Sequence, residues 1–342
     1  MKGAVLYGPK DVRLKDVEIP SVSNGEVLVK VEVALTCGTD AKVYERGGHL
    51  KMIRLPSLFG HEWAGIIIET GKGVKGFKKG DRVVAANSAP CFRCYYCRKE
   101  RFSLCENFTF LNGAYAEYIK VPEAIVKTNL FKIPRDVTYE EAAFLEPLSC
   151  VVHGVEEMGI KKGEEVVING TGPIGLLFLL VLKDLGAKVT VTEKNRERLQ
   201  IAEMLGCDNV VLVKEKGNAV NEVKKFSNKG KGMDIAIEAT GIPKVWEDSI
   251  KMVRGGGRVL LFGGCKPGEK ITLNTELIHY SEITIKGVFH HTPYYVKKAY
   301  DLIAKRRLKL TRLITDRLPL NKISTALDKI VNGEGIKIAI IP

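Results

Sequence analysis

The sequence has no apolar run long enough to cross a membrane. Its longest such run, IGLLFLLVL, covers residues 174–182, whereas a transmembrane helix needs about 20 residues. The N-terminal stretch MKGAVLYGPKDVRLKD carries charges throughout and lacks the apolar stretch of a signal peptide. We therefore expect a cytoplasmic protein without a membrane partner.

The sequence also lacks any block of five or six like charges. It has 53 Lys and Arg against 40 Asp and Glu, which gives a net charge of +13. The two signs are interleaved, as in residues 193–203 (EKNRERLQIAE), and such mixing is typical of a solvated surface. We therefore expect no nucleic acid partner. The alternative is a zinc-containing nucleic-acid-binding protein that uses the basic surface.

Four of the eight cysteines lie within residues 91–105. Cytoplasmic thiols stay reduced, which favours a metal site or catalysis over disulfides. The spacing C-x2-C-x2-C-x7-C lets four thiolates complete a tetrahedron around one ion and leaves no open position. We predict a structural zinc site, with an iron–sulfur cluster as the alternative. Its ligands would be Cys91, Cys94, Cys97 and Cys105.

The pattern of strands and helices changes near residue 150. Before this point, short β-rich segments separated by turns predict a small, largely antiparallel β-domain. Over residues 150–289, strands alternate with helices, which is typical of parallel βαβ units in a doubly wound sheet. Residues 290–342 carry an amphipathic helix and a final strand that we expect to return to the first domain. The fold class is therefore α/β.

A glycine loop follows the first strand of this second region. The stretch VVINGTGPIGLLF has the spacing G-x-G-x-x-G between a strand and a helix, which predicts a dinucleotide site with the pyrophosphate at the helix N-terminus. The residues of this loop are Gly170, Gly172, Pro173, Ile174 and Gly175.

The cofactor preference is predicted from the end of the next strand. Glu193 lies 18 residues after Gly175, where a carboxylate would accept the ribose hydroxyls of NAD and repel the 2′-phosphate of NADP. We therefore predict NAD as the cofactor. Lys194 and Arg198 are nearby cations that could pair with such a phosphate, so NADP stays open as the alternative.

A second set of metal-binding residue types is scattered along the first half of the chain. Cys37 lies in TCGTD, His61 and Glu62 lie in FGHEWAG, and Glu146 lies in LEPLSC. Each residue alone is more often part of a core than a ligand. Together they supply the sulfur, nitrogen and oxygen donors that a catalytic zinc uses while leaving a position for water or substrate. We therefore predict two zinc ions per chain, one structural and one catalytic.

The motifs CGTD, GHEWAG, the cysteine cluster, GAYAEY, EPLSC and GTGPIG occur in the order found in zinc-dependent medium-chain alcohol dehydrogenases. The chain resembles this family over nearly its whole length. It looks most similar to the polyol (sorbitol or iditol) and threonine dehydrogenase branch, which has Glu-Pro-Leu where liver-type enzymes carry a cysteine ligand. The resemblance implies a GroES-like catalytic domain of residues 1–149 and 290–342, a Rossmann domain of residues 150–289, and a homodimer or homotetramer.

The resemblance also implies the zinc ligands and a cofactor contact. Cys37 and His61 would bind the catalytic zinc, and Glu62 and Glu146 would share the remaining positions. Lys337 matches a basic residue that reaches the cofactor pyrophosphate in the family.

A proton relay is a further implication. Thr39 matches the hydroxyl that passes the substrate proton outward, and Lys42 stands where a histidine often completes that relay. The alternative to Lys42 is that the proton leaves through a cofactor ribose or water.

The predicted activity is hydride transfer between NAD and a small secondary alcohol or polyol. Polyol dehydrogenases often place an Arg-Tyr pair at the substrate, and this chain has His290 and His291 there, which argues against sorbitol itself. L-Threonine 3-dehydrogenase and a sugar-phosphate polyol dehydrogenase are the alternatives within the enzymes. A non-catalytic NAD-binding protein is the alternative outside them.

Overall fold

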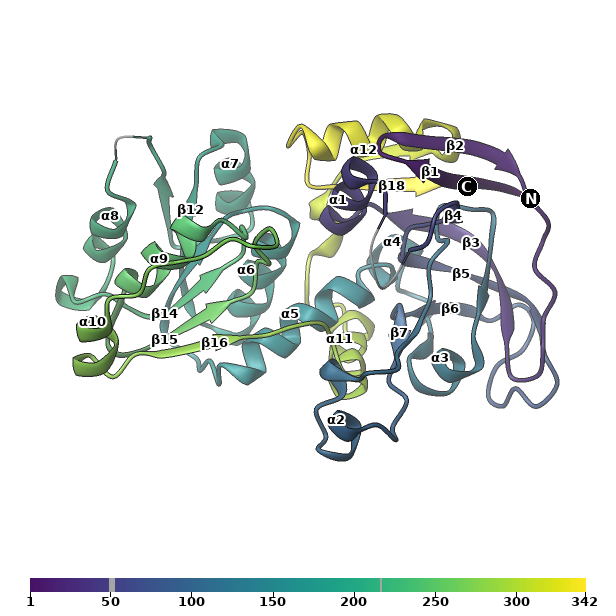
Figure 1. Cartoon of the computed structure of the whole chain (residues 1–342), viewed down its shortest axis with the longest axis horizontal. Helices are drawn as coiled ribbons and strands as arrows, with labels where there is room; N and C mark the ends of the chain where they lie inside the picture. Colours follow the sequence, from purple (N-terminus) through teal and green to yellow (C-terminus); the bar gives the residue numbers. More distant parts are fainter. Residues whose placement is uncertain (49–52, 216) are drawn as a thin grey trace. The chain divides into compact units, whose positions relative to one another are not determined.

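The computed structural model describes residues 1–48, 53–215 and 217–342 (Figure 1). The chain forms two compact units. The first unit comprises Met1–Cys150 and His291–Pro342, and the second comprises Val151–His290. In Figure 1 the purple N-terminal strands and the yellow C-terminal elements belong to the same unit.

The first unit is built around a mostly antiparallel sheet with the strand order β10-β6-β5-β3-β18-β17. Its central strand is β3 (VLVKVEVAL), whose side chains are almost all buried and which also pairs with β9. Smaller sheets have the orders β2-β1-β4 and β7-β8. The strands are β1 (Lys2–Gly8), β2 (Asp11–Asp16), β3 (Val27–Leu35), β4 (Ser57–Leu58), β5 (Glu62–Thr70), β6 (Arg82–Ala85), β7 (Ser88–Ala89), β8 (Thr109–Phe110), β9 (Tyr118–Val121), β10 (Leu130–Lys132), β17 (Ile314–Pro319) and β18 (Lys337–Ile341).

The last strand of the chain completes this sheet. β18 lies between β3 and β17, antiparallel to β3 and parallel to β17. Ala339 is opposite Leu35 in this pairing. The helices with residues in the first unit are α1 (Gly38–Arg46), α2 (Tyr95–Arg98), α3 (Glu123–Thr128), α4 (Tyr139–Ala142), α5 (Leu145–Glu157), α11 (Pro293–Ala304) and α12 (Ile323–Val331).

The second unit contains a six-stranded parallel sheet with the order β13-β12-β11-β14-β15-β16. Its inner strands are buried runs of Val, Ile and Ala, as expected for a parallel sheet. The predicted α/β class and doubly wound sheet are confirmed. The elements are β11 (Glu165–Asn169), α6 (Pro173–Leu185), β12 (Lys188–Glu193), α7 (Arg196–Met204), β13 (Asn209–Leu212), α8 (Ala219–Lys225), β14 (Met233–Glu238), α9 (Pro243–Met252), β15 (Val253–Leu261), α10 (Thr275–Tyr280) and β16 (Thr284–Gly287).

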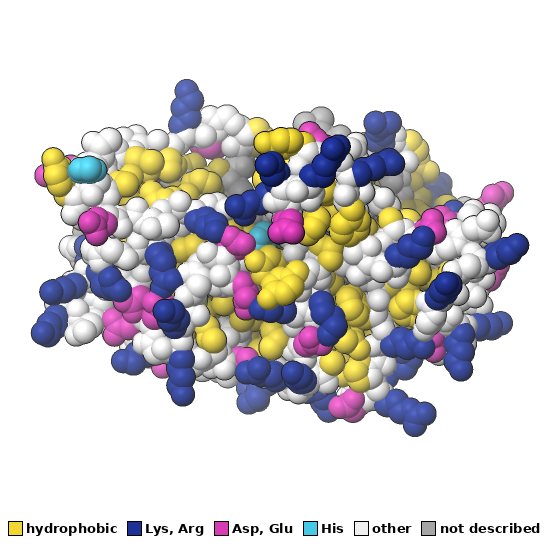
Figure 2. All heavy atoms as spheres, turned by 90° about the horizontal axis from the view of Figure 1, so that it is seen from below, with side chains coloured by type: hydrophobic (Ala, Val, Ile, Leu, Met, Phe, Trp, Pro, Cys, Tyr) yellow, Lys and Arg dark blue, Asp and Glu magenta, His cyan; other side chains and the backbone are white. Residues whose placement is uncertain are grey.

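The apolar run at residues 174–182 forms most of helix α6, and its leucines are largely buried. Among the described residues, no helix has the length and apolar character that crossing a membrane requires. On the face shown in Figure 2, Asp and Glu side chains lie among the Lys and Arg side chains.

Candidate functional site

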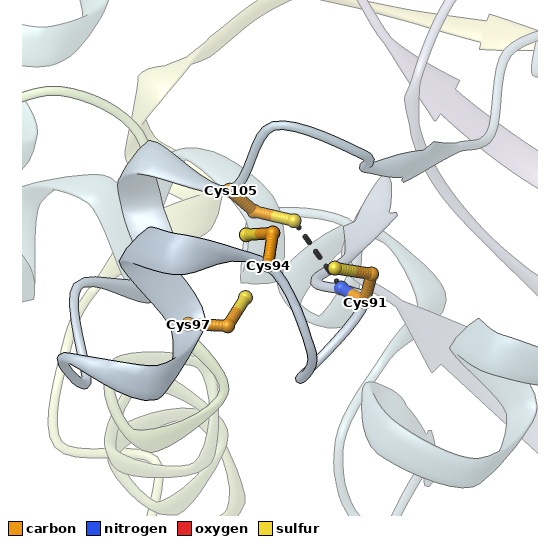
Figure 3. A group of neighbouring side chains, drawn as sticks. All are labelled: Cys91, Cys94, Cys97 and Cys105. Atoms are coloured by element: carbon orange, nitrogen blue, oxygen red, sulfur yellow. Dashed lines mark hydrogen bonds between the residues drawn. The ribbon is translucent and has the colours of Figure 1, made fainter.

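The four clustered cysteines converge in a small lobe of the first unit (Figure 3). All four sulfur atoms lie within 4.8 Å of one another. Helix α2 begins after Cys94 and carries Cys97, while Cys91 precedes it and Cys105 follows it. The backbone N–H groups of Cys91 and Asn107 donate to the sulfur of Cys105, at 3.2 and 3.4 Å.

The chemistry of this donor set suits zinc. The cluster is formed by the cysteines themselves, with the partly buried rings of Phe102 and Phe108 packed against it, so the lobe has little apolar core of its own. Hydrogen bonding, chiefly from the backbone of Arg93, lowers the pKa of Cys91 to about 6. Burial raises the pKa of Cys97 to about 12. A bound cation would favour the thiolate form of all four.

The second predicted metal cluster also forms within the first unit. Cys37 caps the N-terminus of α1, His61 precedes β5, and Glu62 is the first residue of β5. One donor atom from each of these residues lies within 4.8 Å of the others. His61 and Glu62 are buried, and Cys37 is half-buried.

Glu146 reaches the same group from helix α5. Its Oε2 lies 3.9 Å from Nε2 of His61, and its Oε1 lies 3.9 Å from the sulfur of Cys150 one turn further along the helix. Burial raises the pKa of Glu146. The structure therefore brings all four predicted ligands of the catalytic zinc into one buried neighbourhood.

Lys337 neutralises part of this charge. Its ammonium group is buried and forms an ion pair with both carboxylate oxygens of Glu62. Burial raises the pKa of Glu62 to about 7 despite the opposing effect of Lys337. Burial lowers the pKa of Lys337, but the Glu62 carboxylate outweighs it and holds that pKa above its ordinary value. The role of Lys337 at a cofactor pyrophosphate stays a prediction.

Sequence reasoning missed Asp40, which orients His61. Asp40 lies in the first turn of α1, three residues after Cys37, and its Oδ1 is 3.0 Å from Nδ1 of His61. Burial lowers the pKa of His61, but the adjacent Asp40 raises it well above its usual value. A carboxylate on Nδ1 leaves Nε2 as the nitrogen for a metal. The position of Asp40 in the motif CGTD, three residues after the predicted ligand Cys37, was the sequence signal that could have identified it.

The predicted glycine loop connects β11 to α6 in the second unit. Gly170 has a φ of +96°, a backbone conformation that would be strained in any residue with a side chain. A Cβ on Gly175 would lie 1.9 Å from the carbonyl oxygen of Gly170. Any larger residue at position 175 would therefore prevent the helix from packing against the loop. Gly172 caps α6, Pro173 and Ile174 begin the helix, and a Cβ on Gly172 would meet no atom within 4 Å. The loop leaves open space at the helix N-terminus for an anion.

Glu193 ends β12, and its carboxylate holds the loop. Its Oε2 accepts from the backbone N–H and the hydroxyl of Thr171, at 3.0 and 3.1 Å. Its Oε1 accepts from the backbone N–H groups of Lys194 and Asn195. A cavity of about 650 Å³ lies beside it, lined by Lys194, Asn195, Arg196, Glu197, Val213 and Glu215. Arg198 is half-buried on α7.

The remaining predicted residues are placed as follows. Thr39 and Lys42 are exposed on α1, and the backbone N–H of Thr39 donates to the sulfur of Cys37 at 3.4 Å. His290 ends the second unit, where its carbonyl oxygen accepts from His153. His291 is buried in the first unit and hydrogen bonds to Asn87 at 3.2 Å. The roles of these four residues stay predictions.

Known protein families match both units. Residues 23–135 match the alcohol dehydrogenase GroES-like domain, and residues 173–305 match the zinc-binding dehydrogenases. The sorbitol dehydrogenase of Bacillus subtilis is 32% identical, over 100% of this chain and 97% of that protein. The L-threonine 3-dehydrogenase of Bacillus velezensis is also 32% identical, over 96% of this chain and 95% of that protein.

Solved structures agree with these matches. A putative zinc-binding dehydrogenase from Sinorhizobium meliloti bound to NADP superposes with a TM-score of 0.91 at 30% identity, covering 100% of this chain and 99% of that chain. An alcohol dehydrogenase from Thermus gives a TM-score of 0.90 at 28% identity, with the same coverage. The predicted reaction class and the zinc and nicotinamide cofactors are thereby confirmed. The chain belongs to the zinc-dependent medium-chain alcohol dehydrogenase family, in the branch that contains the polyol and threonine dehydrogenases, and it is an oxidoreductase.

Proposed function

We propose that this chain oxidises a secondary alcohol or polyol with NAD at the cluster formed by Cys37, His61, Glu62 and Glu146. One observation carries the proposal: a half-buried sulfur converges there with buried nitrogen and carboxylate donors, and Asp40 already occupies the other nitrogen of His61. Such a mixed donor set suits a catalytic zinc, whereas the four-sulfur lobe suits a structural one.

The residues divide the work as follows. Zinc at this site supplies a Lewis acid that lowers the pKa of the alcohol, and NAD supplies the hydride acceptor. Cys37 and His61 hold the metal, while Glu62 and Glu146 share the remaining positions. Lys337 stabilises the charge on Glu62. Thr39, two residues after Cys37 and exposed, carries the substrate proton outward, and Lys42 lies one turn further along α1.

NAD is the proposed cofactor because Glu193 places a carboxylate at the end of β12. An acidic residue at this strand end binds the adenosine ribose in dinucleotide-binding folds, and the carboxylate of Glu193 would repel a 2′-phosphate there. Lys194 and Arg196 in the neighbouring cavity favour the opposite choice, and a related structure is bound to NADP. The ratio of kcat/KM for NAD to that for NADP therefore tests this choice.

L-Threonine is the second candidate substrate. The threonine dehydrogenase of Bacillus velezensis has the same 32% identity to this chain as the sorbitol dehydrogenase of Bacillus subtilis, over a slightly shorter match. Each of these substrates carries a secondary alcohol that the proposed zinc site can bind.

We also propose a homodimer or homotetramer. Strand β16 pairs only with β15 in the described sheet, so it offers a free edge to a second copy. Tyr280 and Phe289 on either side of this strand are 79% and 67% exposed. Light scattering on the purified protein measures the assembly, and a monomer would contradict this part of the proposal.

The central experiment counts zinc per chain and measures NAD reduction with sorbitol, other polyols, 2,3-butanediol and L-threonine. Two zinc ions in the wild type, one in Cys37→Ser, and turnover of one substrate class support the proposal and identify the substrate. One zinc that survives Cys37→Ser, with no turnover of any substrate, contradicts it.

A further inference from the structure

Tyr115 lies fully buried behind the metal-ligand cluster of the first unit. Its hydroxyl donates to Oδ2 of Asp40 at 2.6 Å and lies 3.2 Å from the carbonyl oxygen of Leu35. The other oxygen of Asp40 is the one that meets Nδ1 of His61. A chain of polar contacts therefore runs from Tyr115 through Asp40 to His61.

The backbone around Tyr115 is also bonded to the segment that ends at His61. The N–H of Tyr115 donates to the carbonyl of Phe59 at 3.1 Å. The N–H groups of Gly113 and Ala114 donate to the carbonyl of Gly60 at 2.9 and 3.1 Å. The motifs FGH and GAY, which lie far apart in the sequence, are thus joined directly before the histidine.

Gly60 leaves room for the tyrosine ring. A Cβ at this position would lie 2.7 Å from Cδ2 of Tyr115, and φ is +89°, so a glycine is needed on both counts. The ring of Phe59 packs edge-on against that of Tyr115 with a centroid distance of 5.0 Å. Packing therefore fixes the ring, and the ring fixes the direction of the hydroxyl.

Asp40 depends on this hydroxyl because its carboxylate is almost completely buried. A buried carboxylate oxygen without a donor costs on the order of 1–3 kcal/mol, and the group would turn to find another partner. Burial and the adjacent Asp40 raise the pKa of Tyr115 well above its ordinary value, so the hydroxyl keeps its proton for donation.

We propose that Tyr115 is a positioning residue for the metal ligand His61: its hydroxyl holds Asp40, and Asp40 holds the imidazole with Nε2 directed at the zinc. The inference rests on the proposed function, because it assumes zinc on His61. Tyr115 touches neither substrate nor cofactor in this role. Such contacts behind a ligand change metal affinity or activity by about 10- to 100-fold when removed.

The test compares two variants that each remove one tyrosine hydroxyl bonded to a carboxylate. Tyr115→Phe keeps the ring and deletes the bond to Asp40. Tyr44→Phe is the control, because Tyr44 also lies in the first unit with a buried ring, and its hydroxyl donates to the carboxylate of Asp328 at 3.1 Å in a partly buried hydrogen bond. Each zinc-loaded protein is mixed with a colorimetric chelator, and the release of each zinc is followed with time.

We expect Tyr115→Phe to release the catalytic zinc about 10- to 100-fold faster than the wild type, with unchanged release from the cysteine lobe. Tyr44→Phe should release both ions at wild-type rates. Equal release from Tyr115→Phe and Tyr44→Phe overturns the inference. Cobalt substitution adds a second readout, since a displaced His61 shifts the visible absorption spectrum of the bound cobalt.

Asp40→Asn and the double variant Asp40→Asn/Tyr115→Phe keep the test decisive if Tyr115→Phe loses stability. If the hydroxyl acts through Asp40, the double variant releases zinc no faster than Asp40→Asn alone. Additive effects contradict the inference. Failure of the proposed function is recognised separately. If the wild type holds zinc at Cys37 but oxidises no alcohol, the proposed function fails and the positioning role of Tyr115 stands. If the wild type holds no zinc at Cys37, both proposals fail.

Discussion

Lys337 and Glu62 lie 275 residues apart in the sequence and form a fully buried ion pair. The lysine begins the last strand, β18, and the glutamate begins β5. The pair joins the end of the chain to the proposed metal site, so the site depends on residues from both segments of the first unit.

Removing one partner of this pair should strongly destabilise the protein. Lys337→Met leaves the Glu62 charge buried and unpaired, which lowers the free energy of unfolding by about 3–5 kcal/mol. Adding Glu62→Gln should restore part of the loss. Urea unfolding of the zinc-free protein measures both. Lys329→Met is the control, because Lys329 and its partner Asp316 are each about one third exposed to solvent, and the change should be within about 1 kcal/mol. Equal losses in the two single variants would refute this account.

Mutations in the two predicted zinc sites should each remove a different zinc ion. Cys97→Ser removes a buried sulfur of the lobe, so zinc content should fall from two ions to one and protease should cut the lobe. Cys37→Ser should also retain one ion but abolish turnover while the lobe stays resistant. Metal analysis and limited proteolysis distinguish the variants. Two ions in purified Cys97→Ser would rule out the four-cysteine site.

The glycines of the nucleotide loop should respond differently to an added methyl group. Gly175→Ala places a Cβ against the Gly170 carbonyl, and it should lower the stability of the protein by about 3 kcal/mol even without cofactor. Gly172→Ala meets open space, so stability should change by less than about 1 kcal/mol. NAD binding to Gly172→Ala should weaken by about tenfold, because backbone must approach the pyrophosphate there. Thermal unfolding and NAD titration give the two quantities, and unchanged NAD affinity would place the pyrophosphate elsewhere.

The charge of Glu193 should set the cofactor preference. Glu193→Gln removes the carboxylate that would repel a 2′-phosphate, so the ratio of kcat/KM for NAD to that for NADP should fall by about tenfold or more. Glu203→Gln, an exposed change on helix α7, which follows β12 in the chain, should leave the ratio unchanged. A wild type that prefers NADP would instead assign the preference to Lys194 and Arg196.

Glu238 should make stability depend on pH. This residue ends β14, burial raises its pKa from 4.5, and Oε2 has no hydrogen-bond partner among the described residues. The folded state therefore binds this proton more tightly than the unfolded chain, so its favourable contribution is complete below pH 4.5 and is lost as pH rises through the folded pKa.

Relative to the wild type, Glu238→Gln should become progressively more stable as pH rises above about 4.5. Unfolding midpoints of both proteins from pH 4 to 8 measure this difference. Glu276→Gln, an exposed change in the same unit, should show no such trend. A difference that is independent of pH would contradict the assignment.

Local spacing was enough to predict two of the sites. The four cysteines lie within 15 residues, and the glycine loop lies directly between a strand and a helix, so no long-range contact is needed to recognise either one. The alternation of strands and helices likewise predicted the parallel sheet, because each βαβ unit is local.

The catalytic cluster could not be derived in this way. Cys37, His61 and Glu146 are far apart in the sequence, so their residue types suggested a donor set but no spacing placed them together, and the resemblance to a family was needed to assign them to one zinc. Asp40 was missed because its contact to His61 crosses 21 residues and depends on the direction of α1. The pairing of Lys337 with Glu62 depends on β18 joining the sheet at β3, which no local pattern specifies.

The position of β18 has a consequence for synthesis of the protein. The strand enters the first sheet between β3 and β17, although β3 leaves the ribosome some 300 residues earlier. The second unit is contiguous and can fold as soon as it emerges, whereas the first must wait for the final residues. Until then the end of β3 at Ala34 and Leu35 lacks its partner strand. A ribosome stalled before residue 337 would therefore hold a folded second unit and an incomplete, aggregation-prone sheet in the first.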